Sequence, residues 1–351
     1  MRKIIYYGVC LLAVLLTGCN GDDGFHGEGD GTVYPVSFEL ADLMQATRVT
    51  GSETPTGLTP GTGLTIAAYN PNNQAFVAMR QYKVNASADG LELEDGNDPM
   101  YLPVGTYDFC VTTPLQTSLS ADNLYGTVPE NTDALGSVTQ EQMGAEKTNI
   151  TLGNLKHVAS QIQFTVQVVK QKVSAIQSFT VQSIDVSGMV AAATDNYYLP
   201  ENRLLMPDID ETGKYKTLTI GGEGVGDVFT AGEAGDGSVA GFVNNQKNPL
   251  IVFPKKESSF DAVVKVNIQA DGETGPALKE LKVKVNRLAF EPGKLYLFEV
   301  NYGWDYVRFS ISVADWVPVE LTDGVGGGEQ AVKNKVTIAE WTETIDNNMT
   351  I

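Results

Sequence analysis

The chain has 351 residues, of which 42 % are hydrophobic, so it is long enough for two domains of ordinary size with sizeable cores. Its 43 acidic and 24 basic residues give a net charge of −19. An acidic surface of this kind repels nucleic acid and anionic lipid headgroups, so we expect neither as a partner.

The first 18 residues have the pattern of a secretory signal peptide. Arg2 and Lys3 precede an apolar run over residues 4–16, which is shorter than the roughly 20 residues that a transmembrane helix needs. The sequence Leu16-Thr17-Gly18-Cys19 then resembles the lipobox of bacterial lipoproteins, in which the cysteine receives a lipid. We therefore predict that residues 1–18 are removed and that Cys19 is lipidated. The alternative is an ordinary signal peptide with an incidental cysteine.

Residues 19–32 have the composition of a flexible tether. They are rich in glycine and acidic residues and too poor in apolar residues to fold. Asp22 and Asp23 resemble the acidic export signal of Bacteroidetes surface lipoproteins. A merely soluble tether is the alternative.

After residue 30 the chain has the pattern of many short β-strands. Runs of β-branched and aromatic residues alternate with polar ones, and clusters of Gly, Pro, Asn and Asp separate the runs. No long segment has the 3.6-residue period of a helix, so the pattern favours an all-β fold of antiparallel β-sandwiches. The expected strands are at 33–43, 64–69, 75–84, 108–112, 149–155, 159–169 and 179–186, and around 264–268 and 281–285.

Two stretches have no clear strand pattern. Residues 114–147 are polar, and we expect a long loop with a short helical turn there; residues 221–241 are rich in glycine and are expected to form a loop. A new run of strands starts near Lys156. This places the boundary between an N-terminal domain at 33–156 and a C-terminal domain at 157–323.

The chain lacks the common catalytic motifs. No G-x-S-x-G, H-E-x-x-H or paired-cysteine motif occurs. Cys110 lies in an apolar strand pattern and is interpreted as a buried structural thiol, since a catalytic thiol needs an activating histidine. His157 is interpreted as a hydrogen-bonding residue at the domain junction. We therefore predict a protein that is not an enzyme and has no catalytic residues.

Two acidic stretches are candidate calcium ligands. Residues 94–98 and 208–211 each carry several carboxylates, but solvated turns are the preferred interpretation of both. We predict no cofactor and no metal site.

Three motifs together resemble one family. The segments are residues 155–164 (LKHVASQIQF), residues 290–300 (FEPGKLYLFEV) and residues 313–316 (VADW). In this order they are similar to the second domain of Bacteroidetes fimbrillins, the subunits of type V pili. Independently of the family, Pro292 and Gly293 predict a turn, after which Tyr296, Phe298 and Val300 alternate onto one buried face.

The resemblance implies a mechanism. It implies two tandem transthyretin-like antiparallel β-sandwich domains, export as a lipoprotein, and cleavage by a trypsin-like protease between Arg48 and Val49. The cut would remove a first strand in which Val36, Phe38 and Leu40 fill a groove. A plain surface arginine is the alternative interpretation of Arg48.

The C-terminal residues 324–351 are expected to form a glycine-rich linker and a donor strand. A flexible linker before short apolar strands suits a segment that fills the groove of a neighbouring subunit. Val336, Ile338 and Trp341 are the residues predicted to enter that groove. The alternative is a strand that closes its own domain.

The expected partners are other pilus subunits, the outer membrane through the lipid before processing, and a receptor on a host or bacterial surface. The expected location is the surface of the outer membrane, and then the extracellular pilus. Two alternatives keep the lipid: a pilus anchor subunit, and a surface glycan-binding lipoprotein with Trp304 and Tyr306 as its aromatic platform.

Overall fold

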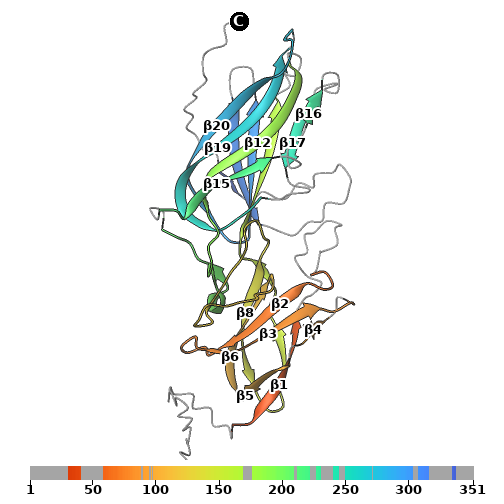
Figure 1. Ribbon diagram of the computed structural model, residues 1–351, viewed down its shortest axis with the longest axis vertical. Coiled ribbons are helices and arrows are strands. Elements are labelled where there is room, and N and C mark those ends of the chain that lie inside the picture. Colours follow the sequence, from red (N-terminus) through yellow and green to blue (C-terminus); the bar gives the residue numbers. More distant parts are fainter. Residues whose placement is uncertain are drawn as a thin grey trace, which may run out of the picture.

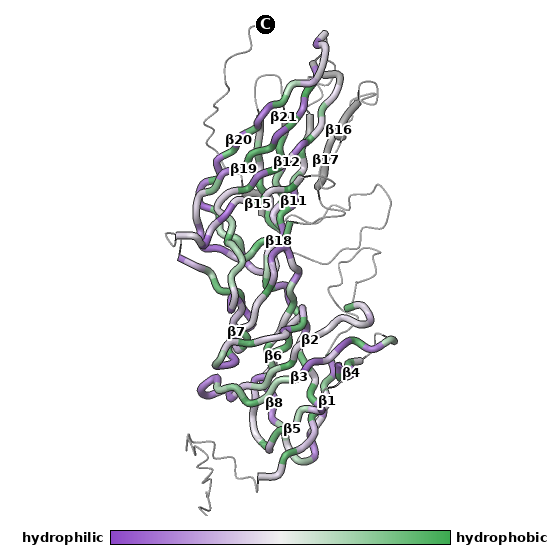
Figure 2. Tube along the Cα trace, in the orientation of Figure 1, coloured by the Kyte–Doolittle hydropathy of each residue, from purple (hydrophilic) through white to green (hydrophobic). Residues whose placement is uncertain are grey.

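The computed structural model of the chain is all-β, as predicted. It describes residues 31–40, 58–87, 90–94, 96, 98–168, 176–208, 212–221, 227–230, 240–244, 250–270, 272–302, 307–315 and 334–336. Among these residues the single helix is a 3-10 turn, η1 (Leu199–Glu201). Figure 1 shows the strands gathered in two lobes that lie one above the other along the long axis. Figure 2 shows hydrophobic and hydrophilic residues alternating along the strands, as expected where one face of a sheet is buried.

The N-terminal lobe has two sheets that share one apolar core, which includes Phe38, Ile66 and Phe109. The first sheet has the order β5 (Met100–Pro103), β1 (Val33–Leu40), β9 (Asn149–Leu152). The second has the order β10 (Lys156–His157), β8 (Leu135–Met143), β6 (Gly105–Thr113), β2 (Gly63–Tyr69), β3 (Phe76–Val84), β4 (Leu91–Leu93).

The C-terminal lobe also has two sheets around one core, which includes Phe164, Phe179 and Phe298. In the first sheet, β18 (Leu250–Val252) also pairs with β11, and the order is β17 (Ala240–Asn244), β11 (Ser160–Val168), β21 (Lys294–Tyr302), β22 (Val307–Asp315), β23 (Asn334–Val336). In the second, β16 (Asp227–Thr230) also pairs with β12, and the order is β15 (Tyr215–Gly221), β12 (Ile176–Val190), β19 (Lys255–Ala270), β20 (Ala277–Phe290).

A small sheet joins the two lobes. Its order is β14 (Arg203–Leu204), β13 (Tyr197–Tyr198), β7 (Tyr125–Gly126). Strand β7 comes from the chain between β6 and β8, whereas β13 and β14 follow β12 of the other lobe. The boundary predicted between residues 156 and 157 falls within β10, and the division into two transthyretin-like domains stays a prediction.

Most strand pairs are antiparallel, but two important pairs are parallel. Strand β1 pairs in parallel with β9, and β11 pairs in parallel with β21 over eight residues. Both pairs join strands that are far apart in the chain, as parallel pairing requires. The alternation of apolar and polar residues is the same in either orientation, so the sequence pattern could not distinguish them.

The loop predicted at 114–147 is wrong in part, because strand β8 (Leu135–Met143) lies within it. β8 pairs with β6 along nine residues, from Leu135 opposite Thr113 to Met143 opposite Gly105. Its sequence, LGSVTQEQM, is mostly polar because much of one face is exposed, so the apolar signal is weak. The loop predicted at 221–241 likewise contains strand β16.

The turn predicted at Pro292 and Gly293 is confirmed. Gly293 has a φ of +68°, and its N–H donates to the carbonyl of Ala159 at 2.8 Å. Beyond the turn, Tyr296, Phe298 and Val300 are all buried in the core of the C-terminal lobe, as their alternation predicts.

Candidate functional site

Strand β1 is the central strand of the first sheet of the N-terminal lobe and lies between β5 and β9. Its first half pairs antiparallel with β5, with Val36 opposite Met100, and its second half pairs in parallel with β9, with Phe38 opposite Ile150. Without β1, strands β5 and β9 would have no partner between them in this sheet. We refer to the space that β1 occupies as the β1 site.

The β1 site is apolar. Val36 and Phe38 are 4 % and 5 % exposed, and Leu40 packs against the same core. The ring of Phe38 makes edge-on contacts with Tyr82 and Phe109, with centroids 5.5 and 5.4 Å away. Such aromatic pairs add stability beyond the area that they bury. The site therefore provides pockets for alternate side chains of an extended strand.

Several of the residues that the sequence singled out lie outside the described residues. These are Cys19, Arg48, Val49, Ile338 and Trp341, together with Trp304, Tyr306 and Trp316.

Val336 is described through its backbone. It lies in β23, which pairs antiparallel with β22, so that Val336 is opposite Ile311. The structure thus places residues 334–336, which form β23, on the sheet of their own C-terminal lobe. The roles predicted for the donor residues, and for Val36, Phe38 and Leu40 as removable groove fillers, stay predictions.

The cysteine, the histidine and one of the acidic residues considered above have structural contacts. Cys110 is buried, as expected, and burial raises the pKa of its thiol, which keeps it protonated and unreactive. His157 is also buried, and its Nδ1 lies 2.6 Å from Oδ1 of Asp133, in agreement with a structural hydrogen bond. Asp208 makes an ion pair with Lys256.

Across the residues that the structure describes, no three His, Cys, Asp or Glu side chains are grouped so as to hold a metal ion.

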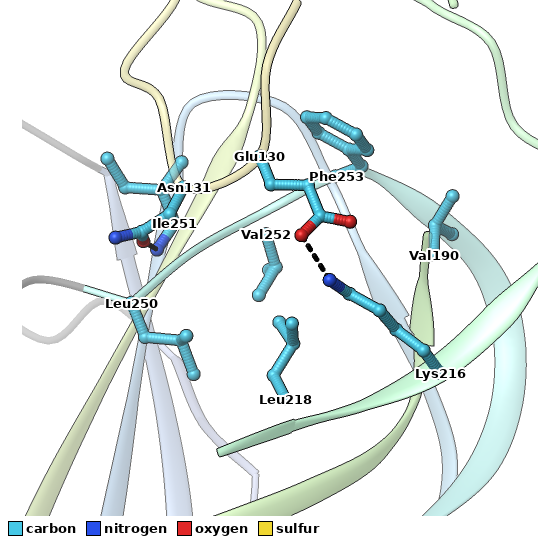
Figure 3. Close-up of a pocket in the computed structure, with 9 residues that line it drawn as sticks. All are labelled: Glu130, Asn131, Val190, Lys216, Leu218, Leu250, Ile251, Val252 and Phe253. Carbon is cyan, nitrogen blue, oxygen red and sulfur yellow. Dashed lines mark hydrogen bonds and ion pairs between the residues drawn. The ribbon is translucent and has the colours of Figure 1, made fainter. Parts of the chain in front are cut away.

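A second cluster of polar side chains lies at the junction of the lobes, and the sequence did not predict it. Figure 3 shows Glu130 of the N-terminal lobe reaching Lys216 of β15, while Asn131 reaches the backbone of Ile251. The other carboxylate oxygen of Glu130 accepts a hydrogen bond from the N–H of Ala192 at 3.0 Å. The bond from Lys216 and, to a smaller extent, the bond from Ala192 hold the pKa of the Glu130 carboxyl below its usual range.

This ion pair closes one side of a small apolar pocket. The pocket lies where β15 and β18 meet the loop that carries Glu130 and Asn131 (Figure 3). It is lined by Glu130, Asn131, Val190, Lys216, Leu218, Leu250, Ile251, Val252 and Phe253.

Asn196 joins the lobes from within. It is buried, its Oδ1 accepts the N–H of Val128 at 2.8 Å, and its Nδ2 donates to the carbonyl of Val128 at 2.9 Å. The two residues are 68 positions apart, so no local sequence pattern marks their contact. The Asp-Asn pair at 195–196 could have predicted a turn but not its partner.

Comparison with known proteins identifies the family. A family model described as fimbrillin-like matches residues 47–316. The chain therefore belongs to the fimbrillin-like family, which confirms the resemblance in the sequence. Membership supports a structural role as a pilus subunit at the cell surface and indicates a protein that is not an enzyme. A comparison with curated proteins finds no match.

Solved structures support the same fold. A fimbrial protein from Bacteroides vulgatus is 12 % identical with a TM-score of 0.55, covering 81 % of this chain and 100 % of its own. A candidate cell adhesion protein from Bacteroides ovatus is 12 % identical with a TM-score of 0.51, covering 82 % of this chain and 99 % of its own. At these identities the likeness concerns the fold alone.

No helix among the described residues is long and apolar enough to span a membrane.

Proposed function

We propose that this chain is a type V pilus subunit that is exported as an outer-membrane lipoprotein and polymerises by strand exchange. The observation that supports the proposal is β1, an N-terminal strand whose buried Phe38 and Val36 complete the core of a lobe. Arg48 follows β1 and is the first lysine or arginine after Lys3. A trypsin-like cut between Arg48 and Val49 would release lipidated Cys19, the tether and β1 together.

The physical consequence of that cut is an open groove. Loss of β1 would leave the edges of β5 and β9 unpaired and would expose apolar side chains such as Met100 and Ile150. Open edges and apolar grooves favour strand addition, in which main-chain hydrogen bonds give strength and alternate side chains give register. Residues 331–351 of a neighbouring subunit, with Val336, Ile338 and Trp341, are proposed to supply the added strand.

The proposal defines partners and locations. The chain is held at the outer membrane by the lipid on Cys19 until it is processed, and then lies in an extracellular pilus with other subunits. A receptor on a host or bacterial surface is a further proposed partner. The net charge of −19 supports the absence of nucleic acid from this list.

The N-terminus of the protein purified from its own cell surface tests the proposal. Intact mass and N-terminal sequencing should give a chain that starts at Val49. A chain that still starts at lipidated Cys19 would contradict processing and would favour a lipid-retaining anchor subunit or a glycan-binding lipoprotein.

Two variants at one position sharpen this test. Arg48→Ala should keep the lipid and abolish the polymer, whereas Arg48→Lys should still be cut, because trypsin-like proteases accept both basic residues. Equal processing of the two variants would show that the cut lies elsewhere.

A deletion tests the other half of the exchange. Removal of residues 331–351 should stop polymerisation and leave a folded monomer, as judged by gel electrophoresis without heating and by circular dichroism. Polymers of unchanged length would contradict the assignment of the donor strand.

A further inference from the structure

One layer of sheet separates the β1 site from the junction of the lobes. Strands β2 and β6 are neighbours in this layer, with Ala67 opposite Cys110 and Ala68 opposite Phe109. Side chains on one face belong to the core that contains Phe38, and those on the other face belong to the core at the junction. Both faces of the layer are therefore packed.

The alternation along each strand divides the side chains between the two cores. Members of the core around β1 are Leu64, Ile66, Ala68, Tyr107, Phe109 and Val111. Members of the core at the junction are Ala67, Tyr69 and Cys110. Phe109, which contacts Phe38 with centroids 5.4 Å apart, is thus followed directly by a residue that packs against the junction.

The segment that contacts the C-terminal lobe also makes hydrogen bonds to strand β2 of this layer. We call residues 116–134 the clasp segment. On one side, the N–H of Gln116 donates to Oγ1 of Thr65 at 2.8 Å and the hydroxyl of Tyr69 donates to the carbonyl of Asn123 at 2.8 Å. On the other side, the clasp segment binds Asn196 and pairs with β13.

We propose that the β1 site and the lobe junction are coupled through the β2–β6 layer, so that an empty β1 site loosens the junction and a bound strand tightens it. The biological use of this coupling rests on the strand exchange proposed above. Close-packed interiors have low compressibility, so a layer packed on both faces transmits a displacement instead of absorbing it. Such coupling is reciprocal, because each site then changes the free energy of the other by the same amount.

Cys110 provides the measurement, because it lies on the junction face of the layer and is fully buried. Alkylation of Cys110 in the full chain, quantified by peptide mass spectrometry under native conditions, reports the opening of the junction. Phe38→Leu and Phe38→Ala both remove contacts in the β1 site. Phe179→Leu is the matched control, since Phe179 is also buried but lies in the core of the C-terminal lobe.

We expect Phe38→Ala to speed alkylation of Cys110 about tenfold or more, which corresponds to an opening eased by about 1.4 kcal/mol. Phe38→Leu should have a smaller effect in the same direction, and it serves alone if the alanine variant does not fold. Phe179→Leu should leave the rate within about twofold in buffer without denaturant, because a local opening of the junction costs less free energy than global unfolding.

An unchanged rate in folded Phe38→Leu, or an equal acceleration in the Phe38 and Phe179 variants, would overturn the coupling. Hydrogen exchange at the amides of Val128 and Ala192, which bond across the junction, gives a second readout that should follow the thiol. The experiment requires no cut at Arg48 and no polymer. The coupling and the proposed strand exchange can therefore fail independently. A chain that is never cut at Arg48 could still show the coupling, and a chain that is cut there could lack it.

Discussion

Lys255 is a buried lysine without a carboxylate partner among its described contacts. Its Nζ donates to the carbonyl of Gly188 at 3.2 Å and lies 4.5 and 5.4 Å from the ring centroids of Phe260 and Phe290. Gly188 has a φ of +63° and lies where the register of β12 against β15 shifts. Burial lowers the pKa of Lys255 to about 8.

This pKa predicts a pH dependence of stability. Between pH 8 and 10.5 the unfolded chain binds more protons at Lys255 than the folded chain does, so the free energy of unfolding should rise with pH in that window. Below pH 8 the lysine is charged in both states, and its burial costs stability. Relative to Lys255→Met, the wild type should gain up to about 3 kcal/mol between pH 7 and 10.5.

Urea unfolding of both proteins at several pH values measures the difference. Exposed Lys282→Met is the control, and its stability should follow that of the wild type across the window. A wild type and a Lys255→Met variant with parallel pH profiles would show that Lys255 is not desolvated as described.

At the scale of the element, β1 owes its stability to alternate residues. Phe38 and Glu39 are neighbours in the same strand, but Phe38 is buried against Phe109 and Tyr82 whereas Glu39 is exposed. Phe38→Ala should lower the free energy of unfolding by about 3–5 kcal/mol, because it removes a buried ring and leaves a cavity. Thermal and urea unfolding of the full chain measure this loss.

Glu39→Ala is the matched control for β1. Because Glu39 points away from the core, its replacement should change stability by no more than about 0.5 kcal/mol. Similar losses in the two variants would mean that the face of β1 that packs inward is not the one described.

The contrast between β21 and β8 explains what the sequence could predict. Tyr296, Phe298 and Val300 alternate as large apolar residues, so the buried face of β21 is evident from local order alone. β8 has mostly polar residues and depends on hydrogen bonds to β6, so its identity as a strand depends on a partner that local patterns do not reveal. Strand β1 resembles β21 in this respect, since its buried residues Val36 and Phe38 alternate with exposed ones in the sequence.

At the scale of the molecule, no local sequence pattern indicates how the lobes meet. The junction depends on polar side chains that bond to distant backbone, such as Asn131 to Ile251, which are 120 positions apart. Composition predicts turns at such asparagines, but their partners are determined by the assembled fold. The motifs of the family could therefore be recognised while the clasp segment could not.

The junction makes a prediction for unfolding. Because the lobes share a core around Tyr197 and hydrogen bonds on both sides of it, we expect the full chain to unfold in urea in one cooperative transition. Asn196→Ala leaves the buried N–H and carbonyl of Val128 without their partner, which should cost about 1–3 kcal/mol for each group.

With that link removed, the weaker lobe should unfold first, so the transition recorded by circular dichroism should broaden or divide into two. Asn286→Ala, at an exposed position of β20, should leave a single transition with its midpoint unchanged. Two separate transitions in the wild type would contradict the cooperative junction, because they would show that each lobe is stable without the contacts that Asn196 and the clasp segment make. A single shared transition would instead show that the two lobes unfold as one cooperative unit.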